Sequence, residues 1–324
     1  IDGARLDAWK AYWAAVLREP WWGHGLSDLG HAYTTVAADR PEIYIGQRFA
    51  HSHNAVLDLV LWVGLPLAVV LLMVLSIWAW RCLRAVAQQR ELVFPLAALA
   101  ALAIHAMLEL PHQFLYFLVP AGICAGCLHH AVSRKTWQIP RAAWVIAGAA
   151  GLLASAVISI DYFPYQERYT EWRYENARVG TPTGIAVEPP WALNQIHDEI
   201  ALYRLPIDAH LTDAQLQWVN RVAAAVASPA AYHAAAKANA QLGHVNQARD
   251  WMMRLNAMLP EDDVKLMQYI WKNDQARLPR LAAIDWPPYQ GKRSTVQFTP
   301  EYVMPRLGGI PDVEAVSEPA SSRD

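Results

Sequence analysis

Two histidines and an asparagine, in the order His51-Ser52-His53-Asn54, lie directly before a long apolar run that covers residues 55–80. Polar, titratable side chains at the point where a chain enters a membrane are costly unless water or a partner surrounds them. A histidine can take a proton from a hydroxyl group near neutral pH. This segment therefore predicts a chemical site at a membrane surface.

Helical spacing places more polar side chains at the same end of the apolar segments. Asn54 and Asp58 are four residues apart, as are His105 and Glu109, so each pair shares one helix face. His112 follows in a turn. If the two helices are antiparallel neighbours, these side chains line one hydrated pocket with the two histidines of the motif.

Arginines in the loop before the apolar run can reach this pocket. They are Arg5, Arg40 and Arg48. An arginine can hold a phosphate through two hydrogen bonds and neutralise charge on a departing diphosphate. With a histidine base, this combination suits transfer of a group from a lipid diphosphate to an acceptor hydroxyl.

Two other interpretations of the same residues stay open. In the first, the side chains only cap helix ends in water. In the second, His51 and His53 bind zinc together with nearby carboxylates, although their spacing is not that of a standard zinc motif.

The chain of 324 residues is apolar and poor in charge, with 54% hydrophobic and 17% charged residues. The apolar residues are concentrated in 55–160, whereas 161–324 has the composition of an ordinary soluble domain. A net charge of −2 gives no basic surface that would favour nucleic acid. The chain starts at Ile1 rather than at methionine, so we expect it to be part of a longer protein.

The three cysteines lie in or beside apolar segments, so no disulfide framework is predicted outside the membrane. Cys124 and Cys127 have the C-x-x-C spacing of redox sites. Because they lie beside Gly122 and Gly126 in an apolar segment, the favoured interpretation is small residues that pack a helix interface.

Four segments have about the 20 apolar residues that a membrane-spanning helix needs. They are residues 55–80, 92–110, 113–131 and 142–160. Basic residues lie in the first and third connections, namely Arg81, Arg84, Arg90, Arg134, Lys135 and Arg141. By the positive-inside rule, these connections are cytoplasmic, and residues 1–54, 111–112 and 161–324 lie on the outer face, the periplasm of a Gram-negative cell.

The segments outside the membrane are predicted to be partly helical. Residues 4–17 are expected to form a helix at the membrane interface, with an apolar face of Leu6, Trp9, Trp13, Val16 and Leu17. After an aromatic exit at 161–165, helices are expected at 165–178, 191–203, 213–227, 230–242 and 245–259. The last two resemble one tetratricopeptide unit, with Gly243 at the turn and Pro260 at the end.

The predicted fold class is all-α: a polytopic membrane helix bundle followed by a mainly helical, tetratricopeptide-like periplasmic domain. Four regions are expected. They are a periplasmic loop at 1–54, the membrane domain at 55–160, a periplasmic helical domain at 161–279, and a Pro-rich, partly disordered tail at 280–324.

Three motifs together resemble the O-antigen ligase/polymerase superfamily. Glu19-Pro-Trp-Trp-Gly-His-Gly25 is similar to its Pro-x-x-Gly-x-Gly loop, and His51-Ser-His-Asn54 to the His-x-His-Asn that opens a helix reaching a glycine. Glu109-Leu-Pro-His-Gln-Phe-Leu-Tyr-Phe117 resembles the Glu-Tyr-Pro segment of one branch, the pilin-type protein O-oligosaccharyltransferases of the PglL type. That branch also carries an extra C-terminal periplasmic domain. Many relatives have a Glu shortly before the glycine, where this chain has Trp62-Val63.

The resemblance implies a glycosyltransferase of the bacterial inner membrane. Such an enzyme moves an oligosaccharide from undecaprenyl diphosphate, on the periplasmic face, to an acceptor hydroxyl, without a metal or other cofactor. By position, it implies that His53 and His51 are the catalytic or donor-binding histidines. Asp58, one turn earlier in the helix, is the candidate to supply the carboxylate that many relatives carry as a Glu shortly before the glycine.

The resemblance also implies roles for other residues of the pocket. By position, Arg5 and Arg48 hold phosphate, and Asn54 orients the loop or binds the donor. We place the remaining polar residues of the pocket, Arg40, His105, Glu109 and His112, with the substrate-binding group.

The acceptor separates the candidate functions. A protein hydroxyl, as in pilin, is favoured by the C-terminal domain, whereas an O-antigen ligase or polymerase uses a lipid A core or a growing glycan. A third candidate is a non-enzymatic membrane transporter or scaffold. Because the ionisable groups lie at the outer ends of helices rather than at mid-membrane, surface chemistry is favoured over transport.

Overall fold

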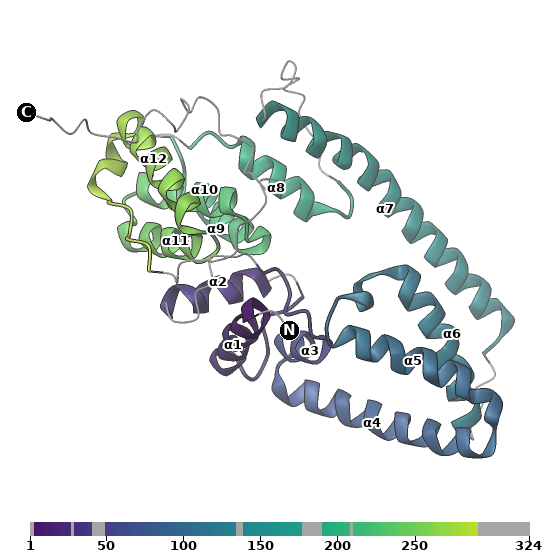
Figure 1. The fold of residues 1–324 in the computed structure, drawn as a ribbon. Coiled ribbons are helices and arrows are strands. Elements are labelled where there is room, and N and C mark those ends of the chain that lie inside the picture. Colours follow the sequence, from purple (N-terminus) through teal and green to yellow (C-terminus); the bar gives the residue numbers. More distant parts are fainter. Residues whose placement is uncertain are drawn as a thin grey trace, which may run out of the picture. The chain divides into compact units, whose positions relative to one another are not determined.

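The computed structural model describes residues 3–26, 29–40, 49–133, 139–176, 190–207 and 210–290, and the regular elements in these ranges are helices (Figure 1). The all-α prediction is therefore confirmed for this part of the chain. Contacts divide the chain into two units, one of Ile1–Pro140 with Leu205–Ser294 and one of Arg141–Arg204 with Thr295–Asp324. The four predicted regions stay a prediction.

The first unit contains ten α-helices in the described residues. They are α1 (Gly3–Arg18), α2 (Leu29–Asp39), α3 (Ala55–Val63), α4 (Leu65–Gln88), α5 (Val93–Ala106), α6 (Leu115–Val132), α9 (Asp213–Val226), α10 (Pro229–Gln241), α11 (Val245–Ala257) and α12 (Glu261–Arg277). The second unit contains α7 (Arg141–Asn176) and α8 (Asn194–Arg204).

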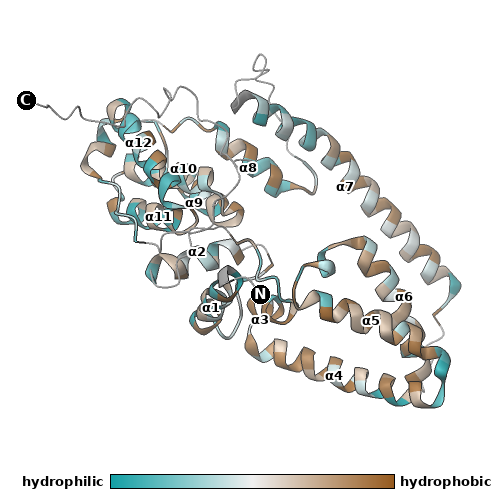
Figure 2. Ribbon diagram, in the orientation of Figure 1, coloured by the Kyte–Doolittle hydropathy of each residue, from teal (hydrophilic) through white to brown (hydrophobic). Residues whose placement is uncertain are grey.

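Three of the described helices are long and apolar enough to cross a membrane: α4, α6 and α7. Hydrophobic residues run along α4, for example (Figure 2). The predicted span at 92–110 is wrong in length, because α5 has 14 residues and ends at Ala106. Its regular backbone cannot continue far, since Pro111 lacks the N–H that a helix interior needs.

The predicted span at 55–80 is interrupted rather than continuous. Gly64, with φ of 80°, ends α3, and α4 begins at the next residue with a proline in its first turn. The left-handed region is open to glycine at little cost. The apolar run therefore forms a short helix, which carries the polar motif at its start, followed by the longer candidate span.

The loop of residues 20–25 covers the break between α3 and α4. The last carbonyls of a helix lack partners within it. Here the His24 N–H donates to the Leu61 carbonyl at 2.6 Å, and the Leu65 N–H donates to the Pro20 carbonyl at 2.8 Å. The similarity of this loop to a Pro-x-x-Gly-x-Gly motif thus has a structural reason, because its backbone caps the end of the helix that begins with the polar motif.

One face of helix α1 is buried within the protein. Ala8, Ala11 and Tyr12 are buried against α2 and α3, whereas Leu6 and Trp13 are 45% and 50% exposed. Alanine side chains let neighbouring helices approach closely, so small residues form this contact together with the larger Tyr12. Part of the predicted apolar face is thus exposed, and the position of this helix at a membrane interface stays a prediction.

Two features of residues 161–290, from here on called the tail, differ from what was expected. The span and the helix expected at 165–178 are not separate elements, because α7 continues through Pro164 to Asn176, and the aromatic exit from the membrane at 161–165 stays a prediction. Helix α12 was not predicted, although Pro260 and three acidic residues in its first turn are typical of a helix start.

The other tail helices lie close to their predicted ranges, as α8 to α11. The structure describes the segment after Pro279 up to residue 290. In this segment the Ile284 carbonyl accepts a hydrogen bond from the Trp271 indole N–H at 2.9 Å. Residues 291–324 lie outside the described residues. Helices α10 and α11 form a hairpin, and its tetratricopeptide character stays a prediction.

The close approach at Gly64 leads to a stability prediction. A Cβ atom at this residue would overlap the Trp21 carbonyl, and one at Gly23 would lie 2.5 Å from the Leu61 carbonyl oxygen. Both glycines also have positive φ. We expect Gly64→Ala to lower the free energy of unfolding by about 2 kcal/mol or more, measured by thermal unfolding of purified full-length protein. Gly122→Ala, where a Cβ meets open space, is the matched control. Equal unfolding temperatures for both variants would contradict this account.

Candidate active site

Asn54 anchors the polar motif to α3. Its side-chain oxygen accepts hydrogen bonds from the Val56 and Leu57 N–H groups, both at 3.1 Å, as an N-cap does. Its amide group donates to the Met107 carbonyl at 3.3 Å. Asn54 therefore joins the start of α3 to the end of α5, which are adjacent at this point as predicted.

The residue before the cap has an unusual backbone. His53 has φ of 55°, which is uncommon for any residue other than glycine. Ser52 and Asn54 hold this turn on either side, since the Asn54 N–H donates to the Ser52 hydroxyl oxygen at 3.2 Å and that hydroxyl donates to the Asn54 carbonyl at 3.1 Å. A strained residue held by its neighbours is typical of functional sites.

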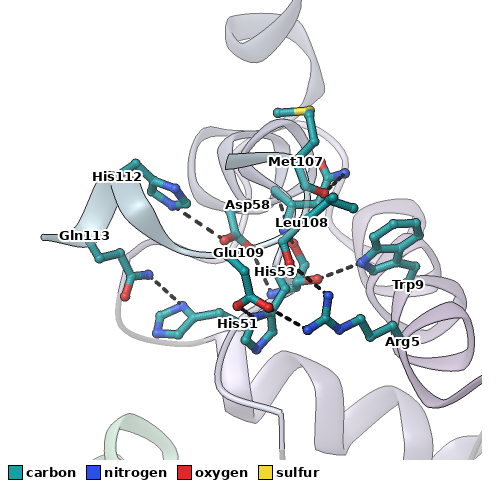
Figure 3. A network of polar contacts seen from close by, with 12 residues as sticks. Arg5, Trp9, His51, His53, Asp58, Met107, Leu108, Glu109, His112 and Gln113 are labelled. Atoms are coloured by element: carbon teal, nitrogen blue, oxygen red, sulfur yellow. Dashed lines mark hydrogen bonds and ion pairs between the residues drawn. The ribbon is translucent and has the colours of Figure 1, made fainter. Parts of the chain in front are cut away.

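Glu109 bridges the predicted base and a predicted arginine (Figure 3). One of its carboxylate oxygens accepts from Arg5 Nη2 at 2.6 Å, and the other lies 3.1 Å from His53 Nδ1. Arg5 Nη1 also donates to the Leu108 carbonyl at 3.0 Å. The Arg5 guanidinium, with a smaller contribution from His53, holds the pKa of the Glu109 carboxyl below its usual value of 4.5. Glu109 is therefore ionised at neutral pH.

The carboxylate determines what His53 can do. An ionised carboxylate only accepts hydrogen bonds, so His53 donates to it from Nδ1. In a neutral imidazole, the lone pair then lies on Nε2, where it can accept a proton. His53 is 30% exposed, so a substrate hydroxyl can reach it. Carboxylate, imidazole and an approaching hydroxyl have the same relationship in hydrolytic triads.

Asp58 was predicted as a catalytic residue, and in the structure its side chain is buried rather than exposed in the pocket. Its side chain is 0% exposed, and Oδ1 accepts from the Ser52 N–H at 3.0 Å. Oδ2 lies 3.8 Å from His112 Nε2, and the His112 ring is 5.8 Å from the Trp62 ring. Asp58 thus contacts the turn that carries His53 and not the surface.

Of the remaining predicted residues, one lies in the cluster around His53, two lie apart from it, and one is not described. His51 belongs to the cluster, because its Nδ1 lies 3.2 Å from Gln113 Nε2 (Figure 3). His105 is exposed, and its ring packs against Phe117 at 5.7 Å. Arg40 is exposed after α2, and within the described residues no hydrogen bond joins its side chain to this cluster. Arg48 lies outside the described residues.

One contact of the site was not predicted. The Trp9 indole N–H donates to the Ser52 carbonyl at 2.7 Å, which ties α1 to the turn (Figure 3). The sequence pattern assigned Trp9 to an apolar face and contained no signal for a polar partner. In the part of the chain that the structure describes, no group of three or more His, Cys, Asp or Glu could hold a metal ion.

The lowered pKa of Glu109 predicts how the Arg5 ion pair depends on pH. A carboxyl whose pKa is depressed by folding stabilises the protein above its unfolded pKa and loses this effect as the pH falls through the folded pKa. We expect Glu109→Gln to lower the free energy of unfolding at pH 7 by about 1 kcal/mol or less, because the pair is partly exposed. The difference from the unchanged protein should shrink as the pH falls below 4.5 and the Glu109 carboxyl becomes protonated, as followed by thermal unfolding.

Glu19→Gln is the control for this comparison, since Glu19 is exposed and its side chain forms no ion pair with another described residue. A Glu109→Gln difference that stayed constant as the pH fell through the acidic range would contradict an ionic origin.

Comparison with known proteins identifies a family and two relatives of this chain. A family model described as "Virulence factor membrane-bound polymerase, C-terminal" matches residues 93–274, more than half of the chain. A "General O-oligosaccharyltransferase" of Acinetobacter baylyi is 26% identical over 263 residues, which are 75% of this chain and 44% of that protein. A "ComP-specific O-oligosaccharyltransferase" of the same organism is 27% identical over 127 residues, 39% of this chain and 22% of that protein.

The chain spans less than half the length of these curated relatives. No solved structure gives a significant match. The family match and the two relatives confirm the resemblance to the O-antigen ligase/polymerase superfamily and its PglL-type branch, although the family match at residues 93–274 does not include the loop or the His-x-His-Asn motif. The chain therefore belongs to the virulence factor membrane-bound polymerase family, in the O-antigen ligase/polymerase superfamily.

Proposed function

We propose that this chain carries the acceptor-activating part of a membrane glycosyltransferase. The enzyme would move an oligosaccharide from undecaprenyl diphosphate to a hydroxyl of a periplasmic protein such as pilin. The observation that carries the proposal is the oriented His53, which Glu109 holds through Nδ1 at a surface that a hydroxyl can reach. The names of the two relatives support oligosaccharide transfer as the chemistry.

In the proposed reaction, His53 Nε2 takes the proton of the acceptor hydroxyl as its oxygen attacks the anomeric carbon of the donor sugar. The bond between that carbon and the diphosphate oxygen breaks, and undecaprenyl diphosphate leaves with the bonding electrons. Glu109 stabilises the imidazolium that forms, because its carboxylate accepts from the protonated ring. The product is a glycoside of the acceptor.

The arginines have distinct positions in this proposal. Arg5 is paired with Glu109, so its first role is to keep that carboxylate ionised and in place. Arg48, next to the motif in the chain, is the candidate to neutralise the departing diphosphate. His51, Asn54, His105 and His112 complete the proposed donor and acceptor pocket, and Asp58 positions the turn through the Ser52 N–H.

A second function has its own support. The family description names a membrane-bound polymerase, in which the accepting hydroxyl would belong to a glycan rather than to a protein. The same base would serve both acceptors, because a sugar hydroxyl and a serine hydroxyl lose a proton in the same way. The third candidate, a non-enzymatic transporter or scaffold, does not need an oriented base.

The first test uses the full-length protein in a host that lacks its own ligase and supplies a lipid-linked glycan and a pilin. We expect His53→Ala to reduce transfer at least about 100-fold, the usual contribution of a general base. Mass spectrometry of the pilin and blotting of lipopolysaccharide measure the product, and membrane blots check protein level. His130→Gln, an exposed histidine at the other end of α6, is the control.

The outcomes separate the candidates. Glycan on pilin that disappears only in His53→Ala supports protein glycosylation with His53 in the mechanism. Glycan on lipopolysaccharide supports the ligase alternative, and longer glycan on the lipid carrier supports the polymerase. Unchanged transfer in His53→Ala at equal protein level would overturn the proposed base.

A further inference from the structure

Helix α2, in the loop before the polar motif, is attached to the tail helices by a chain of polar contacts. Figure 1 shows α2 beside α11, and the two helices are in contact. His31 on α2 lies between two tail residues, with Nε2 2.8 Å from Arg254 Nη1 and Nδ1 3.0 Å from the Tyr232 hydroxyl. The same hydroxyl lies 2.8 Å from Thr34 Oγ1.

The donor and acceptor capacities of these groups allow only one order of donation along this series of hydrogen bonds. Arginine only donates, so His31 Nε2 accepts from Arg254 and Nδ1 carries the hydrogen that it donates to Tyr232. The Tyr232 hydroxyl then donates to Thr34, and the Thr34 hydroxyl donates to the Gly30 carbonyl at 3.1 Å. Burial, with the charge of Arg254, lowers the pKa of His31 to about 3, so the ring is neutral as this pattern requires.

A second set of contacts leads from α2 to the polar motif. The Tyr33 ring lies 5.6 Å from the Tyr12 ring on α1 and 5.7 Å from the Phe49 ring. The Tyr12 hydroxyl donates to the Phe49 carbonyl at 3.1 Å. Together with the bond from Trp9 to Ser52, this places α1 and α2 directly against the residues on either side of His51.

The tail also belongs to the same hydrophobic core. Ala257 at the end of α11 is fully buried in the cluster that contains Tyr12, Tyr33 and Phe49, and Tyr289 packs against that cluster. Gly30 meets the tail closely as well, since a Cβ there would lie 3.0 Å from the Ala227 side chain. The tail helices are thus built into the support of the turn, in addition to any role in acceptor docking.

We infer that Tyr232 and Arg254 are positioning residues, which hold α2 so that α1 and α2 keep the His51–Asn54 turn in its strained, functional shape. The inference rests on the proposed function only in that the turn is taken to carry the base. It predicts that a change in the tail acts on the turnover rate and not on acceptor affinity, whereas a tail that only docks the acceptor would change its KM.

The test compares Tyr232→Phe and Arg254→Met with Arg249→Met in purified full-length protein. Arg249 is exposed on α11, which makes it a matched control. Hydrogen exchange of residues 49–58, read by mass spectrometry, reports the turn independently of activity, because the Ser52 and Asn54 N–H groups are bonded there. We expect exchange to be about tenfold faster in both variants and unchanged in the control, since each variant leaves a buried polar group without its partner.

Activity gives the second reading. In the transfer assay, we expect kcat to fall about tenfold at constant KM for the pilin in Tyr232→Phe, and Thr34→Ser, which keeps the hydroxyl, to retain most of the activity. Because Tyr232→Phe removes a single oxygen, it serves if Arg254→Met fails to fold. Unchanged exchange in Tyr232→Phe, or a change in KM alone, would overturn the inference. Faster exchange with no transfer by the unchanged protein would uphold it and count against the proposed function.

Discussion

The backbone contact between the loop of residues 20–25 and the end of α3 determines where the site is built. Helix α3 is only nine residues long, too short to be stable by itself. Its first turn is capped by Asn54, and its last carbonyls accept N–H groups from the loop. Because Gly23 and Gly64 lack side chains, the two backbones can approach this closely. The helix is therefore held at both ends, and the polar motif starts from a fixed point.

On that foundation, a single carboxylate organises the chemistry. Glu109 follows α5 in an irregular segment before Pro111, which lets its side chain reach both Arg5 and His53. One charge thus aligns the imidazole and occupies an arginine. The buried Asp58 acts on the same turn from beneath, through the Ser52 N–H. Asp58 and Glu109, which the sequence placed in one pocket, thus have different positions, one in the interior and one at the surface.

The tail contacts α2 and does not contact the polar motif directly in the hydrogen bonds described above. Tyr232 and Arg254 contact α2, and α2 and α1 support the turn. Buried contacts of this kind can transmit a displacement between elements, because a packed interior has few voids that could absorb it. The family match at residues 93–274 includes α8 to α11 and most of α12, so the tail helices are part of the domain that the family shares.

The sequence by itself determined the helical class, the approximate ranges of α6 and most tail helices, and several of the polar residues around His53, because hydrophobic periodicity and helix spacing are local properties. Only the tertiary structure decided that Gly64 divides the first apolar run, that α1 is buried through alanines, and that Glu109 rather than Asp58 faces His53. These outcomes depend on contacts between segments about 50 to 100 residues apart, such as Arg5 with Glu109. No local pattern records which distant backbone or charge a side chain will meet.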